Sequence, residues 1–193
     1  APAESATSPA RHLSSPVSST TTCRQFAEIT SERIPKSLQV FRDSDDANLI
    51  REARSTLEHA IALNHLLFEG AYHIIPLLIE LLHVRASKIR AVIYDLLVEI
   101  AQSEAQDESV QILDEARRLV ALDTACRARL LQALPFAWHD LASDNEDTIF
   151  GAMDLIGFVD PDKNRFVEYL RNPIKPFTEK CRHNADEWIA ELG

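Results

Sequence analysis

The chain has 193 residues, which is enough for one sizeable domain with its own core. Hydrophobic residues make up 46% of it and only 4 residues are glycine, so few tight turns and few phosphate-binding loops are expected. The net charge of -10 argues against nucleic acid as a partner, because that binding depends on Lys and Arg that neutralise phosphates. The same acidity is more compatible with solubility, or with docking a protein that has a basic surface.

The N-terminal residues 1–22 are rich in Ser, Thr and Pro, which occupy 13 of the 22 positions. This composition buries too little apolar area to offset the entropy of ordering, so we predict a tail or linker followed by a single domain over 23–193. Three widely separated cysteines, Cys23, Cys126 and Cys181, argue against a disulfide framework and favour the reducing cytoplasm. No membrane-spanning segment and no signal peptide are expected.

Helical periodicity dominates the rest of the chain, which indicates an all-α fold. One helix or two short ones are predicted from residue 23, with a break before Pro35, and a long amphipathic helix over 48–68 that Gly70 ends. Asp160 and Pro161 are typical of a helix start. Further helices are predicted at 71–82, 87–101, 110–121, on either side of a turn within 133–159, and at 177–192.

The hairpin over 69–102 is the most apolar part of the chain. Its first helix is apolar nearly all round, and its second has one continuous apolar face, so neighbours must cover it on both sides. Residues 74–100 align without gaps to 133–159, at an offset of 59 residues, as from Pro76 to Pro135. Asp95 then aligns with Asp154, a position expected to form hydrogen bonds between repeats. A stack of helical hairpins is therefore predicted.

Two stretches carry a resemblance to a known family: IIPLLIELL followed by RASKIRAVIYDLLVEIA, and LPFAWHDLASDNEDTIFGAMDLIGFV. They resemble HEAT-repeat α-solenoids, which have an early Pro, a Leu-Leu at the end of the first helix, a turn with Asp or Asn, and a second helix rich in Ala and Leu. The expected turn occurs only in the later copy, at Asp144 and Asn145. The resemblance covers about residues 46–160 and implies a short HEAT-like α-solenoid of antiparallel helical hairpins with a C-terminal capping helix.

The stretch LNHLLFEGAYHIIPLLIELL is similar to bacterial HEAT-like proteins, some of which serve as immunity partners of polymorphic toxins. This resemblance implies a protein-binding module without catalysis, an immunity protein that binds and blocks a cognate toxin domain with a basic surface. One alternative is a cytoplasmic adaptor or regulatory scaffold. Another is an enzyme like the alkylpurine DNA glycosylases, which would need a basic groove with aromatic residues.

Candidate partner-binding residues lie on the rim of the apolar hairpin and in the acidic turn of the later copy. Rigid stacked helices would present them on a preformed surface, so little ordering cost would accompany binding. They are Tyr72, His73, Arg90, Tyr94, Asp144, Glu146 and Asp147.

The sequence contains no established catalytic, cofactor or metal motif. His59 and His65 are six residues apart, and neither His-Glu-x-x-His nor Cys-x-x-Cys occurs, so no metal site is predicted. His139 and Asp140 beside Trp138 have two interpretations: a proton-transfer pair, or a packed Trp next to a polar helix end. The second is favoured, and no catalytic residue is predicted.

Overall fold

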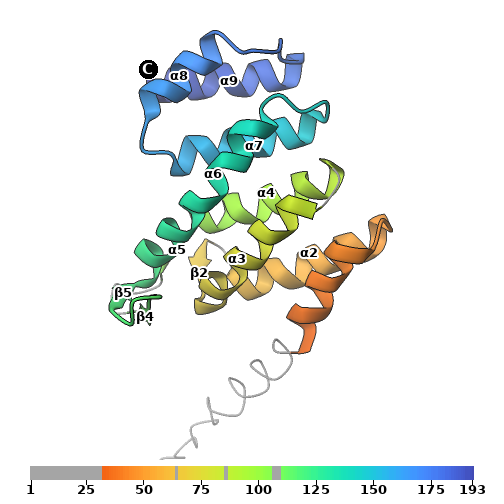
Figure 1. The fold of residues 1–193 in the computed structure, drawn as a ribbon, viewed down its shortest axis with the longest axis vertical. Coiled ribbons are helices and arrows are strands. Elements are labelled where there is room, and N and C mark those ends of the chain that lie inside the picture. Colours follow the sequence, from red (N-terminus) through yellow and green to blue (C-terminus); the bar gives the residue numbers. More distant parts are fainter. Residues whose placement is uncertain (1–31, 64, 85–86, 106–109) are drawn as a thin grey trace, which may run out of the picture.

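A computed structural model of the chain describes residues 32–63, 65–84, 87–105 and 110–193 (Figure 1). The predicted tail and the predicted start of the first helix lie outside these residues. The described chain is mostly helical, as the sequence indicated.

Residues 32–43 are helical, and the helices that follow are α2 (Ala47–Ile61), α3 (Glu69–Val84), α4 (Ser87–Gln102), α5 (Leu122–Leu130), α6 (Leu134–Asp140), α7 (Glu146–Val159), α8 (Lys163–Arg171) and α9 (Glu179–Leu192). A short 3-10 helix, η1 (Leu131–Ala133), joins α5 to α6. The strands are β1 (Ala62–Leu63), β2 (Leu66–Leu67), β3 (Glu104–Ala105), β4 (Gln111–Leu113) and β5 (Leu119–Ala121).

Several helices begin at a side chain that accepts hydrogen bonds from the first turn. Asp46 accepts from two backbone N–H groups of α2, Asn145 from one in α7 and Thr178 from one in α9. The cap of α8 is Asp162, not Asp160, so this helix begins two residues later than Asp160 and Pro161 predicted. Asp160 is instead buried and accepts a hydrogen bond from a tryptophan of α6, as described below.

The helices lie in layers that follow one another from one end of the molecule to the other (Figure 1). The helix over 32–43 and α2 lie at one end, α3 and α4 come next, then α5, α6 and α7, and α8 and α9 lie at the other end. Between layers, α2 packs on α3 and α4, α4 packs on α7, and α7 packs on α9. Each layer therefore covers apolar surface that its neighbour alone would leave exposed.

The core lies along the centre of this stack. The two predicted apolar helices are present as α3 and α4, and many of their large apolar side chains are buried, with Ile75, Leu78, Leu82, Leu96 and Leu97 all at 0% exposure. The helix over 32–43 continues through Pro35, where the sequence predicted a break. Phe41 of that helix is fully buried in the core.

Two predicted helical segments are hairpins of β-strands instead. The helix predicted over 48–68 ends at Ile61, and β1 and β2 follow it as an antiparallel pair, with β3 parallel to β2. His65, between β1 and β2, has a φ of 62°, which a helix does not accommodate. Gly70 lies inside α3 and does not end α2. A Cβ at this position would lie 2.6 Å from the Ala60 carbonyl oxygen and would clash with it, so glycine is the residue that permits the close approach.

The second such segment is 110–121, where β4 and β5 pair antiparallel with Ile112 opposite Val120. The turn between them is closed by Asp114, whose carboxylate accepts hydrogen bonds from the backbone and the guanidinium of Arg118. Arg117 has a φ of 59° in this turn. Over so short a segment the spacing of the apolar residues does not decide between helix and strand, and the turn chemistry does.

Candidate functional site

Arg90 and Tyr94, two of the predicted contact residues, lie in the interior. Tyr94 is 0% exposed and its hydroxyl donates to Oδ2 of Asp140 at 2.7 Å. Arg90 donates to the same oxygen through Nε, also at 2.7 Å, and to the carbonyl of Leu82. These bonds join α3, α4 and the end of α6, so both side chains stabilise the fold and do not belong to an exposed contact surface.

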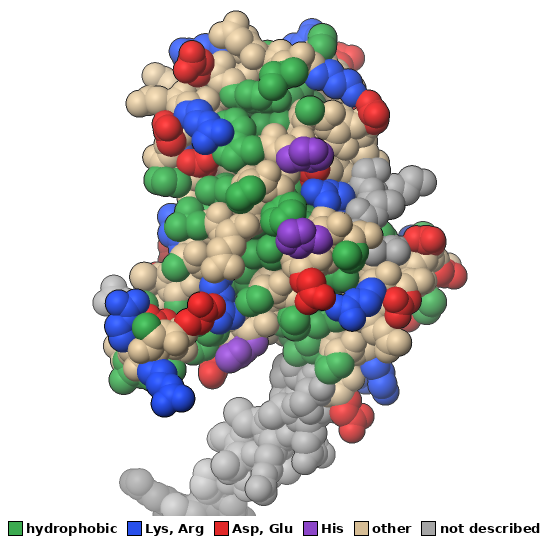
Figure 2. Space-filling model, viewed as in Figure 1, with side chains coloured by type: hydrophobic (Ala, Val, Ile, Leu, Met, Phe, Trp, Pro, Cys, Tyr) green, Lys and Arg blue, Asp and Glu red, His purple; other side chains and the backbone are tan. Residues whose placement is uncertain are grey.

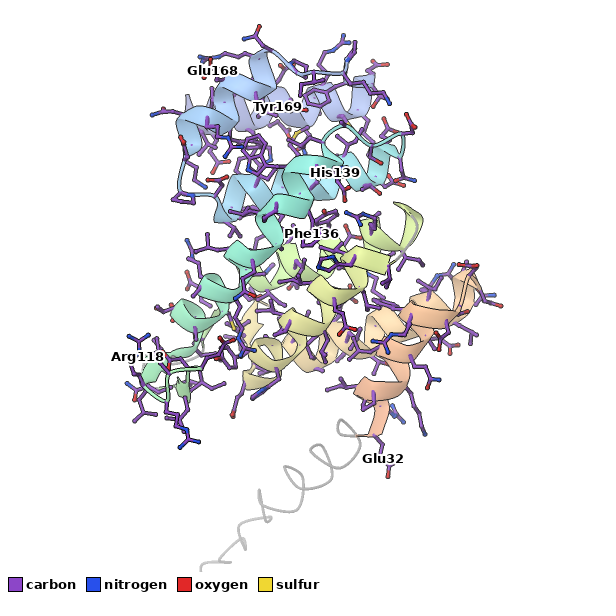
Figure 3. All side chains as sticks on the ribbon, viewed as in Figure 1. Glu32, Arg118, Phe136, His139, Glu168 and Tyr169 are labelled. Atoms are coloured by element: carbon purple, nitrogen blue, oxygen red, sulfur yellow. The ribbon has the colours of Figure 1, made fainter. Side chains whose placement is uncertain are left out.

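His139 and Asp140 have the geometry of a structural pair. Asp140 is buried and already accepts from Arg90 and Tyr94, while the His139 side chain is 85% exposed and lies on α6 with its Nδ1 3.2 Å from the carboxylate (Figure 3). The neighbouring Trp138 donates to Asp160 at 2.8 Å and packs edge-on against Phe166. This geometry supports the packing interpretation of the segment.

Carboxylates from four different helices form what we call the acidic strip: Glu58 of α2, Asp95 of α4, Asp147 and Asp154 of α7, and Glu187 of α9. These helices follow one another through the layers of the molecule (Figure 1). Glu58, Asp147 and Asp154 are all near enough to Asp95 to disfavour its ionisation. Glu187 acts in the same way on Asp154, so the strip extends to the last helix.

The pKa of two carboxyls in the strip is raised. Burial is the main cause at Asp95, where Arg54, 3.1 Å away, opposes it and the neighbouring carboxylates add to it. Burial is also the main cause at Asp154, opposed by hydrogen bonds from Asn184 and Trp188, both at 2.9 Å. Most carboxylates of the strip also contact a basic side chain: Arg54 contacts both Glu58 and Asp95, Lys180 contacts Asp147, and His183 contacts Glu187. The negative charge of the strip is therefore partly balanced within the protein.

Asp95 and Asp154 also confirm the expectation that this repeated position bonds between layers. Asp95 on α4 pairs with Arg54 on α2, and Asp154 on α7 accepts from two side chains of α9. The same two residues thus hold layers together and supply the centre of the strip.

The predicted acidic turn lies where α7 begins, and each of its carboxylates contacts the segment at the start of α9. Lys175 binds Asp144, the Thr178 hydroxyl donates to Glu146, and Lys180 binds Asp147 at 2.7 Å. Lys175 also holds the pKa of the Asp144 carboxyl below its usual range. Only Asp147 belongs to the acidic strip, and its side chain is 69% exposed.

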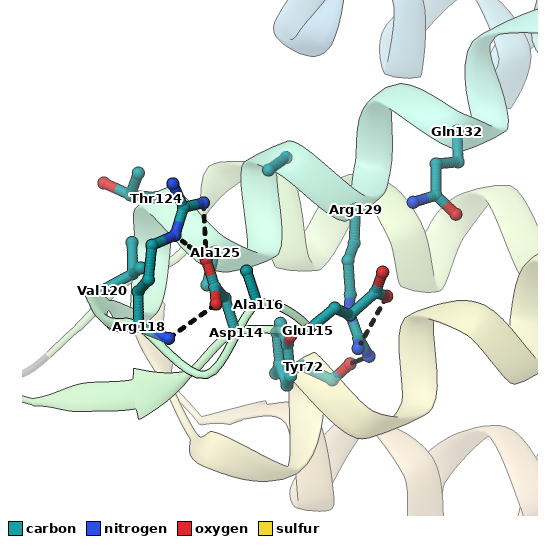
Figure 4. Close-up of a pocket in the computed structure, with 11 residues that line it drawn as sticks. Tyr72, Asp114, Glu115, Ala116, Arg118, Val120, Thr124, Ala125, Arg129 and Gln132 are labelled. Carbon is teal, nitrogen blue, oxygen red and sulfur yellow. Dashed lines mark hydrogen bonds and ion pairs between the residues drawn. The ribbon is translucent and has the colours of Figure 1, made fainter.

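Tyr72 and His73 lie near the start of α3, and they differ in exposure. His73 is exposed, whereas Tyr72 is 4% exposed and lines a cavity of about 400 Å³ between α3, α5 and the β4–β5 hairpin (Figure 4). On the face shown in Figure 2, side chains of both charges gather over this hairpin. The cavity also includes Arg129 of α5, a residue that no sequence motif singled out, because only the fold brings it to Tyr72.

Comparison of the chain with protein-family models, with curated proteins and with solved structures found no match. Within the described ranges, no group of three or more His, Cys, Asp or Glu side chains is placed to hold a metal ion. None of the helices in the described part of the chain is both long and apolar enough to cross a membrane.

Proposed function

We propose that this protein is a binding module without catalysis and that its acidic strip docks a partner protein with a basic surface. The observation that carries the proposal is the strip itself, in which Glu58, Asp147 and Asp154 lie within electrostatic reach of Asp95, and Glu187 lies within reach of Asp154. Because their helices are packed together, the carboxylates are held in place before binding, and little ordering cost falls on association.

We further propose that the layers are HEAT-like helical hairpins and that α8 and α9 form the C-terminal cap of a short α-solenoid. The order of the layers along the chain supports this proposal, as does the alignment of 74–100 with 133–159. The equivalent roles of Asp95 and Asp154 between layers add to it.

For the partner we propose a cognate toxin domain, which makes the protein an immunity protein that covers a basic active-site surface. The resemblance of the region around α3 to bacterial HEAT-like proteins supports this choice, and the charge of the strip is complementary to such a surface. We place the complex in the cytoplasm, because Cys126 and Cys181 are both free and buried, as in a reducing compartment.

The test is co-purification of the full chain with the proteins encoded beside its gene, followed by calorimetry on any complex. The double variant Asp95→Lys with Asp147→Lys reverses two charges of the strip, and we expect it to weaken binding about 100-fold or more. The matched control is Glu52→Lys with Glu168→Lys, which changes the net charge equally at two exposed positions outside the strip.

We expect the control variant to bind within about threefold of the wild type, since exposed charges away from an interface act weakly. Circular dichroism and thermal unfolding check that both variants are folded. Equal loss of binding in the two variants would show that net charge, not the strip, determines binding. If the strip variant bound as tightly as the wild type, the strip would not be part of the interface.

A further inference from the structure

The cavity beside the β4–β5 hairpin is within the range of small-ligand sites, at about 400 Å³. Its walls are apolar over most of their area, with Val120, Ala125 and Ala128 among them, and a few charged groups converge on it (Figure 4). It is formed by α3, α5 and the hairpin, and none of its lining residues belongs to the acidic strip. A site here would therefore be distinct from the proposed partner surface.

Arg129 is held rigidly on one side of this cavity. Pro76 lies inside α3 and has no N–H, so the carbonyl of Tyr72, four residues earlier, lacks its helical donor. Nη1 of Arg129 donates to that carbonyl at 2.6 Å, and the guanidinium stacks 3.5 Å above the Tyr72 ring. The proline thus creates the acceptor that orients the arginine.

The Nε–Nη2 edge of Arg129 lacks one hydrogen bond. Nη2 donates to Glu115 at 3.2 Å, but the buried Nε has no hydrogen-bond partner among the residues that the structure describes. A buried N–H without an acceptor is destabilising, and this edge of a guanidinium matches the two oxygens of one carboxylate. Glu115 satisfies half of the edge from a side chain that is 74% exposed.

We propose that the cavity binds a carboxylate carried on an apolar body, and that this carboxylate replaces Glu115 on the Nε–Nη2 edge of Arg129. The apolar wall takes the body of the ligand. A singly charged group fits better than a phosphate dianion, because the other cation at the cavity, Arg118, is engaged by Asp114 through bonds of 2.8 and 2.7 Å. The charge of Arg129 is then the one available to the ligand.

The test is titration of the full chain with phenylpropionate, followed by calorimetry and saturation-transfer NMR, against the uncharged phenylpropionamide. We expect the acid to bind at least tenfold more tightly than the amide, because only the acid pairs with the guanidinium. Glu115→Ala removes the competing carboxylate, and we expect it to tighten binding of the acid at least threefold. Arg129→Gln is expected to weaken it at least tenfold.

Arg127→Gln is the matched control, since it removes an exposed cation of the same helix, α5, that does not line the cavity. It should leave the affinity for the acid within about twofold, as expected for an exposed charge. Equal binding of acid and amide would overturn the proposal. Arg129→Gln risks unfolding the protein, so Glu115→Ala tests the proposal independently. If folded Glu115→Ala bound the acid with unchanged or weaker affinity, the proposal would also be overturned.

A second pair of probes identifies the source of the carboxylate. The peptide Ala-Ala-Leu-Phe is titrated with a free and with an amidated C-terminus. Tighter binding of the free peptide than of phenylpropionate indicates the C-terminus of a protein chain as the natural ligand. Tighter binding of phenylpropionate indicates a small free acid. The whole series uses no toxin domain, so its outcome is independent of the proposed immunity function.

Discussion

The buried carboxylate of Asp140 and the half-buried carboxylate of Asp154 show how much a single residue contributes to the layered packing. Asp140 joins α6 to α4 and has a cationic partner, Arg90, in addition to Tyr94. Asp154 joins α7 to α9 through neutral donors alone, from Asn184 and Trp188. The negative charge of Asp140 is therefore paired with a positive one, whereas the negative charge of Asp154 is not. Partial burial accordingly destabilises the ionised form of Asp154 and raises the pKa of its carboxyl.

This difference predicts how Asp154 affects stability at different pH. The pKa of Asp154 in the folded state lies above its unfolded value, so the fold favours the protonated carboxyl. The contribution of this carboxyl to the free energy of unfolding is therefore most favourable below the ordinary carboxyl pKa and is lost as pH rises through the folded-state pKa. Asp154→Asn keeps an acceptor oxygen and cannot ionise. We therefore expect its free energy of unfolding, relative to the wild type, to increase from about pH 4 to about pH 7.

Urea unfolding at both pH values measures the effect. Asp154→Ala is the companion variant, which leaves Asn184 and Trp188 without their acceptor and should lose about 2–4 kcal/mol at either pH. If Asp154→Asn instead became less stable relative to the wild type as pH rose, the fold would stabilise the ionised carboxylate. That result would contradict the prediction that burial raises its pKa.

At the scale of elements, the contact between α4 and α7 is the most extensive one between helices of the described part of the chain. Gly151 of α7 is buried, and a Cβ built on it would lie 2.7 Å from Cβ of Tyr94 on α4. Since Tyr94 is fixed by its bond to Asp140, the neighbouring helix cannot easily move aside. A glycine at this position allows the two helices to approach, although glycine is a poor helix former.

Gly151→Ala is expected to destabilise the protein by about 1–3 kcal/mol, because the methyl group forces α4 and α7 apart. Thermal or urea unfolding measures the change, and the intrinsic helix propensity of alanine predicts the opposite sign, by about 1 kcal/mol. A variant as stable as the wild type or more stable would show that α4 and α7 adjust to the added methyl group without loss of stability.

On the scale of the whole molecule, the acidic strip is a property that no single helix has. Glu58 and Glu187 come from the second and the last helices of the stack, and Asp95, Asp147 and Asp154 lie between them. Charges aligned over several packed elements produce a field that steers an oppositely charged partner before contact.

The association rate of a basic partner should therefore depend on salt. We expect the rate constant to fall about tenfold or more between about 50 and 300 mM NaCl, while dissociation changes little. Stopped-flow mixing with the partner obtained by co-purification measures it. The Asp95→Lys with Asp147→Lys variant should lose this dependence. An association rate insensitive to salt in the wild type would mean that apolar contacts, not the strip, govern the encounter.

The sequence by itself determined the helical class and the two apolar helices at its centre. The apolar residues of α3 and α4 are too numerous for an exposed helix, so burial between neighbours followed from composition and period. The alignment of Asp95 with Asp154 also indicated their bonding role between layers. Periodicity failed at 62–67 and at 111–121, because left-handed residues such as His65 and Arg117 and the turn closed by Asp114 decide the structure there.

Only the tertiary structure decided which side chains are available for binding. Arg90 and Tyr94 were expected on a rim, but the packing of α4 against α6 and α7 turns them inward to Asp140. The same packing aligns the acidic strip and brings Arg129 over Tyr72, across 57 positions of sequence. A helical period fixes which residues share a face of one helix, whereas the neighbour that covers the face depends on contacts between distant elements.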